Sequence, residues 1–367
     1  MSTNLEVGIL GLPNVGKTTL FNALTKAGVT VSNYVSSTIE PNVGVVEVPD
    51  IRLLKLAEMY KPKKITPTKM QFVDIAGLGK GASKGAGLGN KFLSHIRQVD
   101  AVIQVVRCFV DESMHGEGEL NPLSDIEILN TELCLADLET LEKRQDRIQK
   151  LVKSGDKKAQ GELEVLGRLK AALEDTKPVR QVIESDEERA LVRELNLLTL
   201  KPILYVANID EKDAADPDAS EYVKMVQQYA AQDGAEAIAI SAKIEAEIAE
   251  LSEEEARDFL AELGLAESGL DKVIKASFKL LGLMTFLTAG EPEVRAWTIA
   301  NGTRAQRAAG KIHSDIERGF IRAETVAYDD LMAHGSFGAA KEKGLVRLEG
   351  KDYIMKDGDV VHFRFNV

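Results

Sequence analysis

The segment Gly11-Leu-Pro-Asn-Val-Gly-Lys-Thr18 constrains this chain most, because it matches G-x-x-x-x-G-K-[ST] at every fixed position. It follows a short apolar run, Val7–Leu10, and precedes a helix-favouring stretch, Thr19–Lys26. A strand, a glycine-containing loop and a helix in this order surround an anion with backbone N–H groups and the positive end of the helix. The pattern therefore predicts that the chain binds a nucleoside triphosphate.

The loop and the start of the following helix supply the predicted phosphate contacts. These are Asn14, Val15, Gly16, Lys17, Thr18 and Thr19. Lys17 is expected to reach the β- and γ-phosphates, and the Thr18 hydroxyl to ligate Mg²⁺. Asp74 ends an apolar strand in the pattern D-x-x-G, where a carboxylate holds Mg²⁺ through a water molecule. Thr38, in a polar stretch between these elements, is expected to close over the metal when the γ-phosphate is present, the alternative being a solvated loop threonine.

Size, charge and cysteine content limit the class of protein. The chain has 367 residues, a formal net charge of −12 and two cysteines, Cys108 and Cys134. Two or three domains are expected, and the acidic balance argues against indiscriminate binding to DNA. The absence of a long apolar run or a secretory signal pattern predicts a cytoplasmic protein without a membrane partner. The cysteines are then expected to be buried and inert, not paired in a disulfide, and the alternative is that either thiol is redox-responsive.

The order of apolar patterns predicts three structural parts. Short β-branched runs alternating with helical patterns indicate an α/β fold with a doubly wound, mostly parallel sheet. Heptad-spaced apolar residues over Cys134–Val152 and again over Leu163–Leu173 indicate an inserted antiparallel helical hairpin, either a rigid spacer or a docking arm. Short strands around one helix, His313–Arg318, indicate a C-terminal β-grasp-like module. The predicted domains are a P-loop G-domain in two segments, 1–124 and 199–280, an inserted helical coiled-coil domain, 125–198, and the C-terminal domain, 281–367.

A second motif bears on the choice of base. Asn208-Ile-Asp-Glu211 follows the apolar run Ile203–Ala207, where proteins that bind GTP place N-K-x-D. Ile209 replaces the lysine, and Glu211 replaces the aspartate that clamps guanine, so guanine selectivity should be lost. Asn208 is expected to serve the adenine amino group and N7, with Ile209 as an apolar wall, which favours ATP over GTP. The predicted base contacts are Asn208, Ile209, Glu211, Ser241 and Ala242.

The residue that assists hydrolysis is harder to identify. Leu78 stands where many GTPases carry a glutamine that orients the attacking water, and leucine has no donor or acceptor. His115, in a polar segment, is the candidate catalytic residue because its pKa lies near neutrality, although a solvated surface histidine is the alternative. Lys80 and Lys84 compete with it as charge stabilisers at the γ-phosphate. Asn14 in the phosphate loop leaves room for a K⁺-assisted mechanism.

Together these motifs closely resemble the Obg-like ATPases of the YchF subfamily, and the resemblance spans nearly the whole chain. The segments that carry it, besides the phosphate loop, are Pro41–Val46, Phe72–Leu78, Asn208–Glu211, Ala289–Thr298, Ala309–His313 and Lys356–Val360. The last three are similar to the start, middle and end of that family's TGS domain, a β-grasp module. The family tends to carry a hydrophobic residue at the position of Leu78.

The resemblance implies a magnesium-dependent ATPase of GTPase fold with a coiled-coil arm, associated with the ribosome and its RNA. It also implies that His115 is the mobile histidine proposed to act in hydrolysis in the family. Residues Val294–Val367 contain twelve Lys/Arg against ten Asp/Glu, so the C-terminal module is less acidic than the rest of the chain. We expect a monomer. The competing readings are a nucleotide-gated binding protein with incidental hydrolysis and an ordinary GTPase.

Overall fold

The computed structural model describes residues 5–26, 41–75, 87–110 and 120–366, without the side chains of 87–90. The chain divides into two compact units. The first comprises residues 1–46 and 71–273, and the second comprises residues 47–70 and 274–367. Each unit is built on a six-stranded sheet. No helix in the described ranges is both long and apolar enough to cross a membrane.

The sheet of the first unit has the strand order β2-β4-β1-β5-β6-β7. The pairs β1–β4, β1–β5, β5–β6 and β6–β7 are all parallel. The phosphate loop therefore follows the carboxyl end of a central strand, which is where open α/β sheets bind ligands. The strands are β1 (Glu6–Leu10), β2 (Asn42–Glu47), β4 (Lys69–Asp74), β5 (Ala101–Cys108), β6 (Ile203–Ile209) and β7 (Glu236–Ile240).

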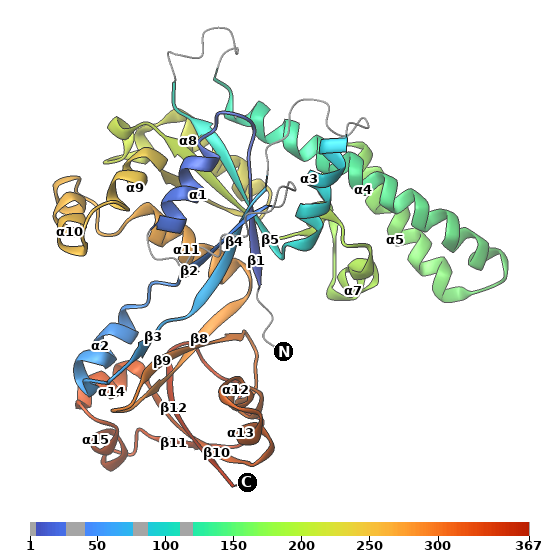
Figure 1. The fold of residues 1–367 in the computed structure, drawn as a ribbon. Coiled ribbons are helices and arrows are strands. Elements are labelled where there is room, and N and C mark those ends of the chain that lie inside the picture. Colours follow the sequence, from blue (N-terminus) through green and yellow to red (C-terminus); the bar gives the residue numbers. More distant parts are fainter. Residues whose placement is uncertain (1–4, 27–40, 76–86, 111–119, 367) are drawn as a thin grey trace. The chain divides into compact units, whose positions relative to one another are not determined.

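Helices cover both faces of this sheet, as an α/β fold requires (Figure 1). On one face α3, α4 and α8 enclose a large cluster of buried apolar side chains with β5 and β6. On the other, α1 packs against α9. The unit also contains α10 (Glu253–Glu262), which has no buried residue, and α11 (Gly269–Leu280) crosses its boundary at residue 273. The bounds of the others are α1 (Lys17–Lys26), α3 (Gly87–Gln98), α8 (Glu221–Gln232) and α9 (Ala242–Ile248), with one-turn 3₁₀ helices η4 (Glu211–Asp213) and η5 (Pro217–Ala219).

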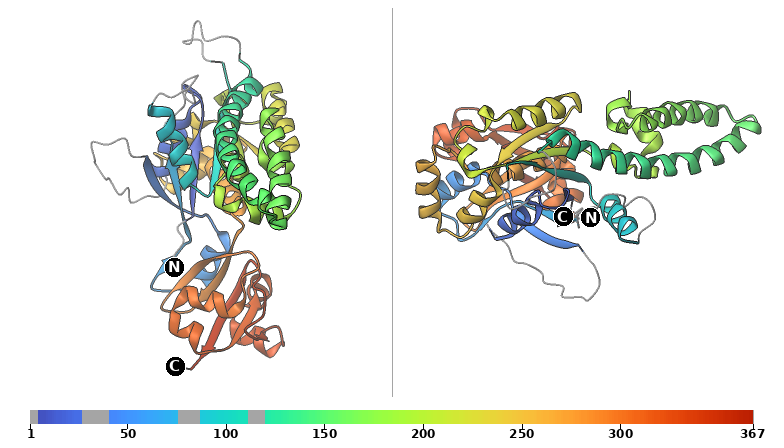
Figure 2. Two further views of the ribbon diagram at one scale, coloured as in Figure 1. Left: turned by 90° about the vertical axis from the view of Figure 1, so that its right-hand side faces the viewer. Right: turned by 90° about the horizontal axis from the view of Figure 1, so that it is seen from above.

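A helical hairpin extends from this unit, in green in Figure 2. It consists of α4 (Pro122–Lys153) and α5 (Lys157–Glu174), joined by a turn in which Gly155 has a φ of +90°. The predicted heptad residues line the contact between the helices, with Leu141, Ile148 and Leu166 fully buried. The chain returns through α6 (Val179–Val182), α7 (Asp186–Val192), η2 (Arg193–Leu195) and η3 (Leu198–Leu200).

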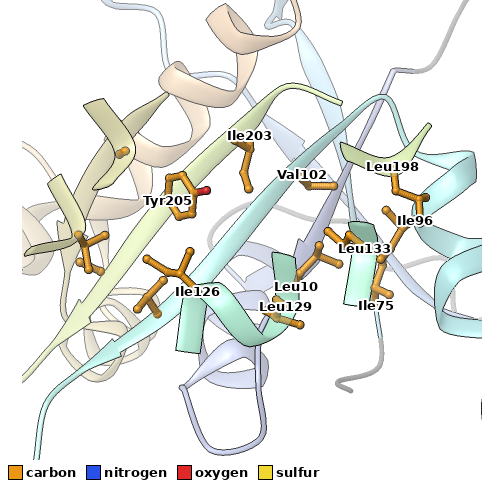
Figure 3. Close-up of a cluster of buried hydrophobic side chains, with 14 of the residues drawn as sticks. Leu10, Ile75, Ile96, Val102, Ile126, Leu129, Leu133, Leu198, Ile203 and Tyr205 are labelled. Carbon is orange, nitrogen blue, oxygen red and sulfur yellow. The ribbon is translucent and has the colours of Figure 1, made fainter. Parts of the chain in front are cut away.

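The hairpin does not begin as a separate module at residue 125. The helix starts at Pro122, capped by the Asn121 side chain, which accepts a hydrogen bond from the Ser124 N–H. Its first turns belong to the core of the α/β unit, because Ile126, Leu129 and Leu133 lie beneath β5 and β6 (Figure 3). Only the later part of α4 packs on α5.

The second unit has the strand order β11-β10-β12-β8-β9-β3. β8 and β9 form an antiparallel hairpin, and the last strand, β12, lies parallel beside β8, which is a β-grasp arrangement. The strands are β3 (Ile65–Thr66), β8 (Leu283–Ala289), β9 (Val294–Ala300), β10 (Phe320–Ala327), β11 (Arg347–Glu349) and β12 (Asp359–Phe365). The helices are α2 (Ile51–Tyr60), α12 (Ala305–Ile312), α13 (Ser314–Arg318), α14 (Tyr328–His334) and α15 (Phe337–Glu342).

The structure differs from the sequence-based predictions mainly in this unit. Residues 47–70 were expected within the first G-domain segment, but Leu53 and Leu56 of α2 pack in a cluster with α14 and α15, and β3 pairs with β9. The module has four helices after residue 300 instead of one. Residues 353–355 form no strand and contribute a single bridge, Arg304 to Ile354. The α/β fold and the hairpin are confirmed.

Candidate nucleotide site

The phosphate loop connects β1 to α1, as predicted. Val15 is buried and anchors the loop, whereas Asn14, Thr18 and Thr19 are exposed on the side where a ligand would lie. The first N–H groups of α1 have no partner within the helix, since a helix begins with unpaired donors. The loop is therefore arranged to place N–H groups and the positive helix end around a phosphate.

Two glycines of the loop are required by close packing. A Cβ atom on Gly11 would lie 2.7 Å from Val15 Cγ2 and 3.2 Å from the Val105 carbonyl oxygen. Gly16 has a φ of +89°, and a Cβ there would lie 2.1 Å from Asn208 Nδ2. Both fixed glycines of the motif thus serve the packing of the loop against β5 and β6.

Lys17 and Asp74 are brought together as the sequence predicted for the phosphate end of the site. The Lys17 ammonium donates to Asp74 Oδ1, and the two side chains are only 11% and 12% exposed. The contact arises because β4 pairs in parallel with β1, with Asp74 opposite Ile9. The carboxyl ends of both strands therefore lie at the same edge of the sheet.

The oxygen atoms near this edge suit a magnesium ion bound with a triphosphate. Thr18 supplies an exposed hydroxyl on the first turn of α1, and Asp74 supplies a carboxylate beside Lys17. Mg²⁺ prefers few protein oxygens together with water and phosphate, which fits such a sparse set. No group of three or more His, Cys, Asp or Glu side chains in the described part of the chain could hold a metal by itself. Thr38 lies outside the described residues.

Asn208 has a different role from the predicted one. Its Nδ2 donates to the Val15 carbonyl oxygen at 2.9 Å, and its Oδ1 accepts from the Ala242 N–H at 2.9 Å. The side chain is only 5% exposed. Asn208 therefore ties the phosphate loop to the loop after β7. The amide atoms expected to face adenine already hold these two loops together.

Ile209 does not offer the expected apolar wall for the base. It is 3% exposed and packs in the same cluster as Ile203 and Tyr205, on the face of β6 opposite Asn208. Glu211, at the start of η4, remains accessible, and its Oε2 accepts from Lys243 Nζ at 2.6 Å. Ser241 is buried, and its hydroxyl has no hydrogen-bond partner among the described residues.

His115, Leu78, Lys80 and Lys84 lie outside the described residues. The catalytic assignment of His115 stays a prediction.

A hollow elsewhere on the first unit is separate from this site. Its volume is about 470 Å³, and its lining includes Asp100, which precedes β5, and Pro202, which precedes β6. The phosphate loop follows the carboxyl end of β1, and these strands are parallel. The hollow is therefore at the opposite edge of the sheet, away from the nucleotide chemistry.

A buried polar cluster links α6, on the return from the hairpin, to α8 and to the strand that carries Asn208, and the sequence motifs did not indicate it. Arg180 in α6 forms an ion pair with Asp233 at the end of α8, and the Asp233 carboxylate also accepts from Gln181 and from the Tyr205 hydroxyl at 2.7 Å. Asp233 is fully buried, and burial raises the pKa of Tyr205.

Comparisons with known proteins agree with this geometry. Residues 6–137 match a family model described as "50S ribosome-binding GTPase", and residues 283–366 match the YchF-GTPase C-terminal model, described as "Protein of unknown function (DUF933)". The chain is 60% identical over 364 residues to the "Ribosome-binding ATPase YchF" of Bacillus subtilis, covering 99% of this chain and 100% of that protein. It is 53% identical over 363 residues to the protein of the same name from Escherichia coli O157:H7, covering 99% of each.

A solved structure supports the same relationship. The Schizosaccharomyces pombe YchF GTPase superposes with a TM-score of 0.87 at 37% identity, covering 99% of this chain and 98% of that one. Similarity over the full length of both chains accounts for the phosphate loop, the inserted hairpin and the C-terminal module together. The chain belongs to the YchF family of P-loop proteins with the GTPase fold.

Proposed function

We propose that this chain binds and hydrolyses ATP with Mg²⁺ and associates with the ribosome as a nucleotide-dependent switch. The observation that carries the proposal is the phosphate loop, held by Asn208 against the loop after β7, with Lys17 and Asp74 meeting at its open side. The relatives named "Ribosome-binding ATPase YchF" support both the reaction and the partner.

Each described residue at the phosphate end has a distinct part in this proposal. Lys17 leaves Asp74 and neutralises the β- and γ-phosphates, while the N–H groups of Gly16 and Thr19 hold the phosphate oxygens. Thr18 and Asp74 hold the magnesium ion, which supplies charge neutralisation of the triphosphate. We add Thr38 to the residues that hold the metal because of its position in the polar stretch between the phosphate loop and Asp74. We assign the catalytic role to His115 on the family resemblance. K⁺ near Asn14 is a further element of the proposal.

The preference for ATP rests on two base loops, the segment Asn208–Glu211 at the end of β6 and the segment Ser241–Lys243 after β7. Glu211 stands in place of the aspartate of N-K-x-D, and its carboxylate is held by Lys243. The solved relative is titled a GTPase, which keeps GTP as the second candidate substrate. Competition of ATP and GTP for a fluorescent nucleotide analogue decides between them. A preference for GTP of about tenfold or more would overturn the assignment.

The ribosomal partner is argued from the relatives and from the C-terminal unit. Arg304, Arg307 and Arg318 are exposed in and beside α12 and α13, a surface that suits contact with ribosomal RNA. In the same proposal the protein is a cytoplasmic monomer with a TGS-type C-terminal domain and no DNA partner.

Single-turnover hydrolysis with and without ribosomes tests the proposal. Stimulation by ribosomes, lost in His115→Ala, is the expected result. A chain whose hydrolysis ignores ribosomes, and whose ribosome binding is gated by ATP but unaffected by His115→Ala, would instead be a nucleotide-gated binding protein with incidental hydrolysis.

A further inference from the structure

The residues expected to face the base are already engaged by the protein itself. Asn208 uses its amide oxygen and nitrogen to bridge the Val15 carbonyl and the Ala242 N–H, and Ile209 packs in the core. Glu211, which stands at the position of the guanine-clamping aspartate, and Lys243 on the facing loop have side chains that are 40% and 69% exposed. Because Glu211 holds the motif position, we look for base selection in this pair and not in the neighbouring pair of Asp210 and Lys212, which are 35% and 74% exposed.

Glu211 and Lys243 meet because of the register of β6 and β7. These strands are parallel, with Asn208 opposite Ile240, so η4 and the start of α9 leave the same edge of the sheet as the phosphate loop. Lys243 Nζ lies 2.6 Å from Glu211 Oε2. Among the described residues, no other side chain hydrogen-bonds the Glu211 carboxylate. That hydrogen bond, together with the charge of Glu211, raises the pKa of Lys243, so its ammonium stays charged.

The pair presents a hydrogen-bond pattern different from that of a lone carboxylate. Guanine offers two neighbouring donors, N1–H and the 2-amino group, which need both oxygens of an unshared carboxylate. One oxygen of Glu211 is held by Lys243, and its charge is balanced. Adenine offers an amino donor beside a ring-nitrogen acceptor. An acceptor on Glu211 beside a donor on Lys243 complements that edge.

We propose that Lys243 is a specificity-determining residue: it withholds the Glu211 carboxylate from guanine and supplies the donor that complements adenine. The inference rests on the proposed binding of ATP and assigns its selectivity to the ion pair between the two base loops.

The test measures dissociation constants for Mg²⁺ complexes of ATP, GTP and ITP by calorimetry. ITP lacks the 2-amino group of GTP and so reports whether a carboxylate takes both guanine donors. The variant is Lys243→Met, which keeps the side-chain stem and removes the charge at an exposed position. The matched control is Lys212→Met, which removes the same charge from an exposed lysine that pairs with Asp210 at 3.8 Å. Thermal melting checks that each variant is folded.

The full chain should bind GTP and ITP equally, because the 2-amino group is unused. In Lys243→Met the preference for ATP over GTP should fall by about tenfold, and GTP should bind about threefold or more tighter than ITP. A preference within about twofold of the parent chain, or an equal shift in Lys212→Met, overturns the role of Lys243. If the parent chain itself does not bind ATP, the proposed function fails first; ATP binding with an unchanged preference refutes the inference alone.

Discussion

The Lys17 ammonium contacts the Asp74 carboxylate, and these are two groups that a triphosphate and its metal would engage. Both side chains are nearly buried, which makes an unpaired charge at either position costly. Nucleotide binding must separate the pair. A phosphate can replace Asp74 beside Lys17, but Asp74 then needs a cation of its own, and Mg²⁺ provides one.

This relationship predicts that Asp74→Asn uncouples nucleotide binding from magnesium. In EDTA the variant should bind ATP about fivefold more tightly than the parent chain, because Lys17 has lost its competing partner and the phosphates no longer meet a carboxylate. Addition of Mg²⁺ should change its affinity less than about twofold. Calorimetric titrations with EDTA and with Mg²⁺ measure both quantities. An affinity that still rises with Mg²⁺ as in the parent chain would show that Asp74 does not hold the metal.

Asn208→Ala should weaken ATP and GTP binding by the same factor. The substitution leaves the Val15 carbonyl and the Ala242 N–H without their partner, each worth about 1–3 kcal/mol when buried. Because the amide positions the phosphate loop, the loss should not depend on the base. Competition titrations with the two nucleotides, combined with urea unfolding, separate affinity from stability. A loss of affinity for ATP without a loss for GTP would show that Asn208 contacts adenine.

Asp233→Asn should be among the most destabilising single substitutions in the first unit. It leaves Arg180 buried without its counter-ion, a change that typically costs about 3–5 kcal/mol. The control is Asp218→Asn, which removes an exposed carboxylate that accepts from Gln227 and should cost less than about 0.5 kcal/mol. Urea unfolding measures both free energies. Equal effects of the two substitutions would mean that the buried pair does not hold α6 against the α/β unit.

The two cysteines should make the chain less stable in alkali. Burial raises the pKa of both Cys108 and Cys134 to about 12, whereas an unfolded thiol ionises near about 8.5. Between these values the unfolded chain releases protons that the folded chain keeps, so stability falls as pH rises, by about 1.4 kcal/mol per pH unit for each thiol. The full contribution is present below pH about 8.5. Unfolding curves of the parent chain and Cys134→Ala at pH 8 and 10 test this, since the variant should lose less stability.

Labelling with a thiol reagent gives an independent check of the same burial. Neither cysteine should react in the folded chain at pH 8, and both should react after unfolding in urea. Fast labelling of the native chain would place at least one thiol at the surface.

The sequence predicted the phosphate end of the site because its information is local. Gly11, Gly16 and Lys17 lie within one loop, and the apolar runs on either side define its strand and helix. Asp74 could be added because the end of one parallel strand lies beside the end of the next. The buried contact between the two helices of the hairpin could also be predicted, because heptad spacing specifies which face of each helix is covered.

The roles of Asn208 and Ile209 depended on tertiary contacts that the motif does not contain. Asn208 meets Val15 and Ala242, which are far from it in sequence. The alternation of β6 was a usable signal, because residues 203, 205, 207 and 209 share the core face and put Asn208 on the other.

The assignment of α2 was wrong for a related reason. Its periodicity identifies Leu53 and Leu56 as a buried face but does not say which sheet that face covers. Helix α12 was missed although Ala305, Ala308 and Ala309 recur at helical spacing between polar residues, because the pattern covers only eight residues and includes Gly310.

Calorimetric titration of the purified chain with ATP in the presence of Mg²⁺ tests the account most directly, with Lys17→Ala titrated alongside. We predict saturable binding at one site in the parent chain and an affinity at least about a hundredfold weaker in the variant, because the phosphates lose their main protein cation. No heat of binding in the folded parent chain, or equal affinity in Lys17→Ala, would contradict the assignment of this loop as the site of a nucleoside triphosphate.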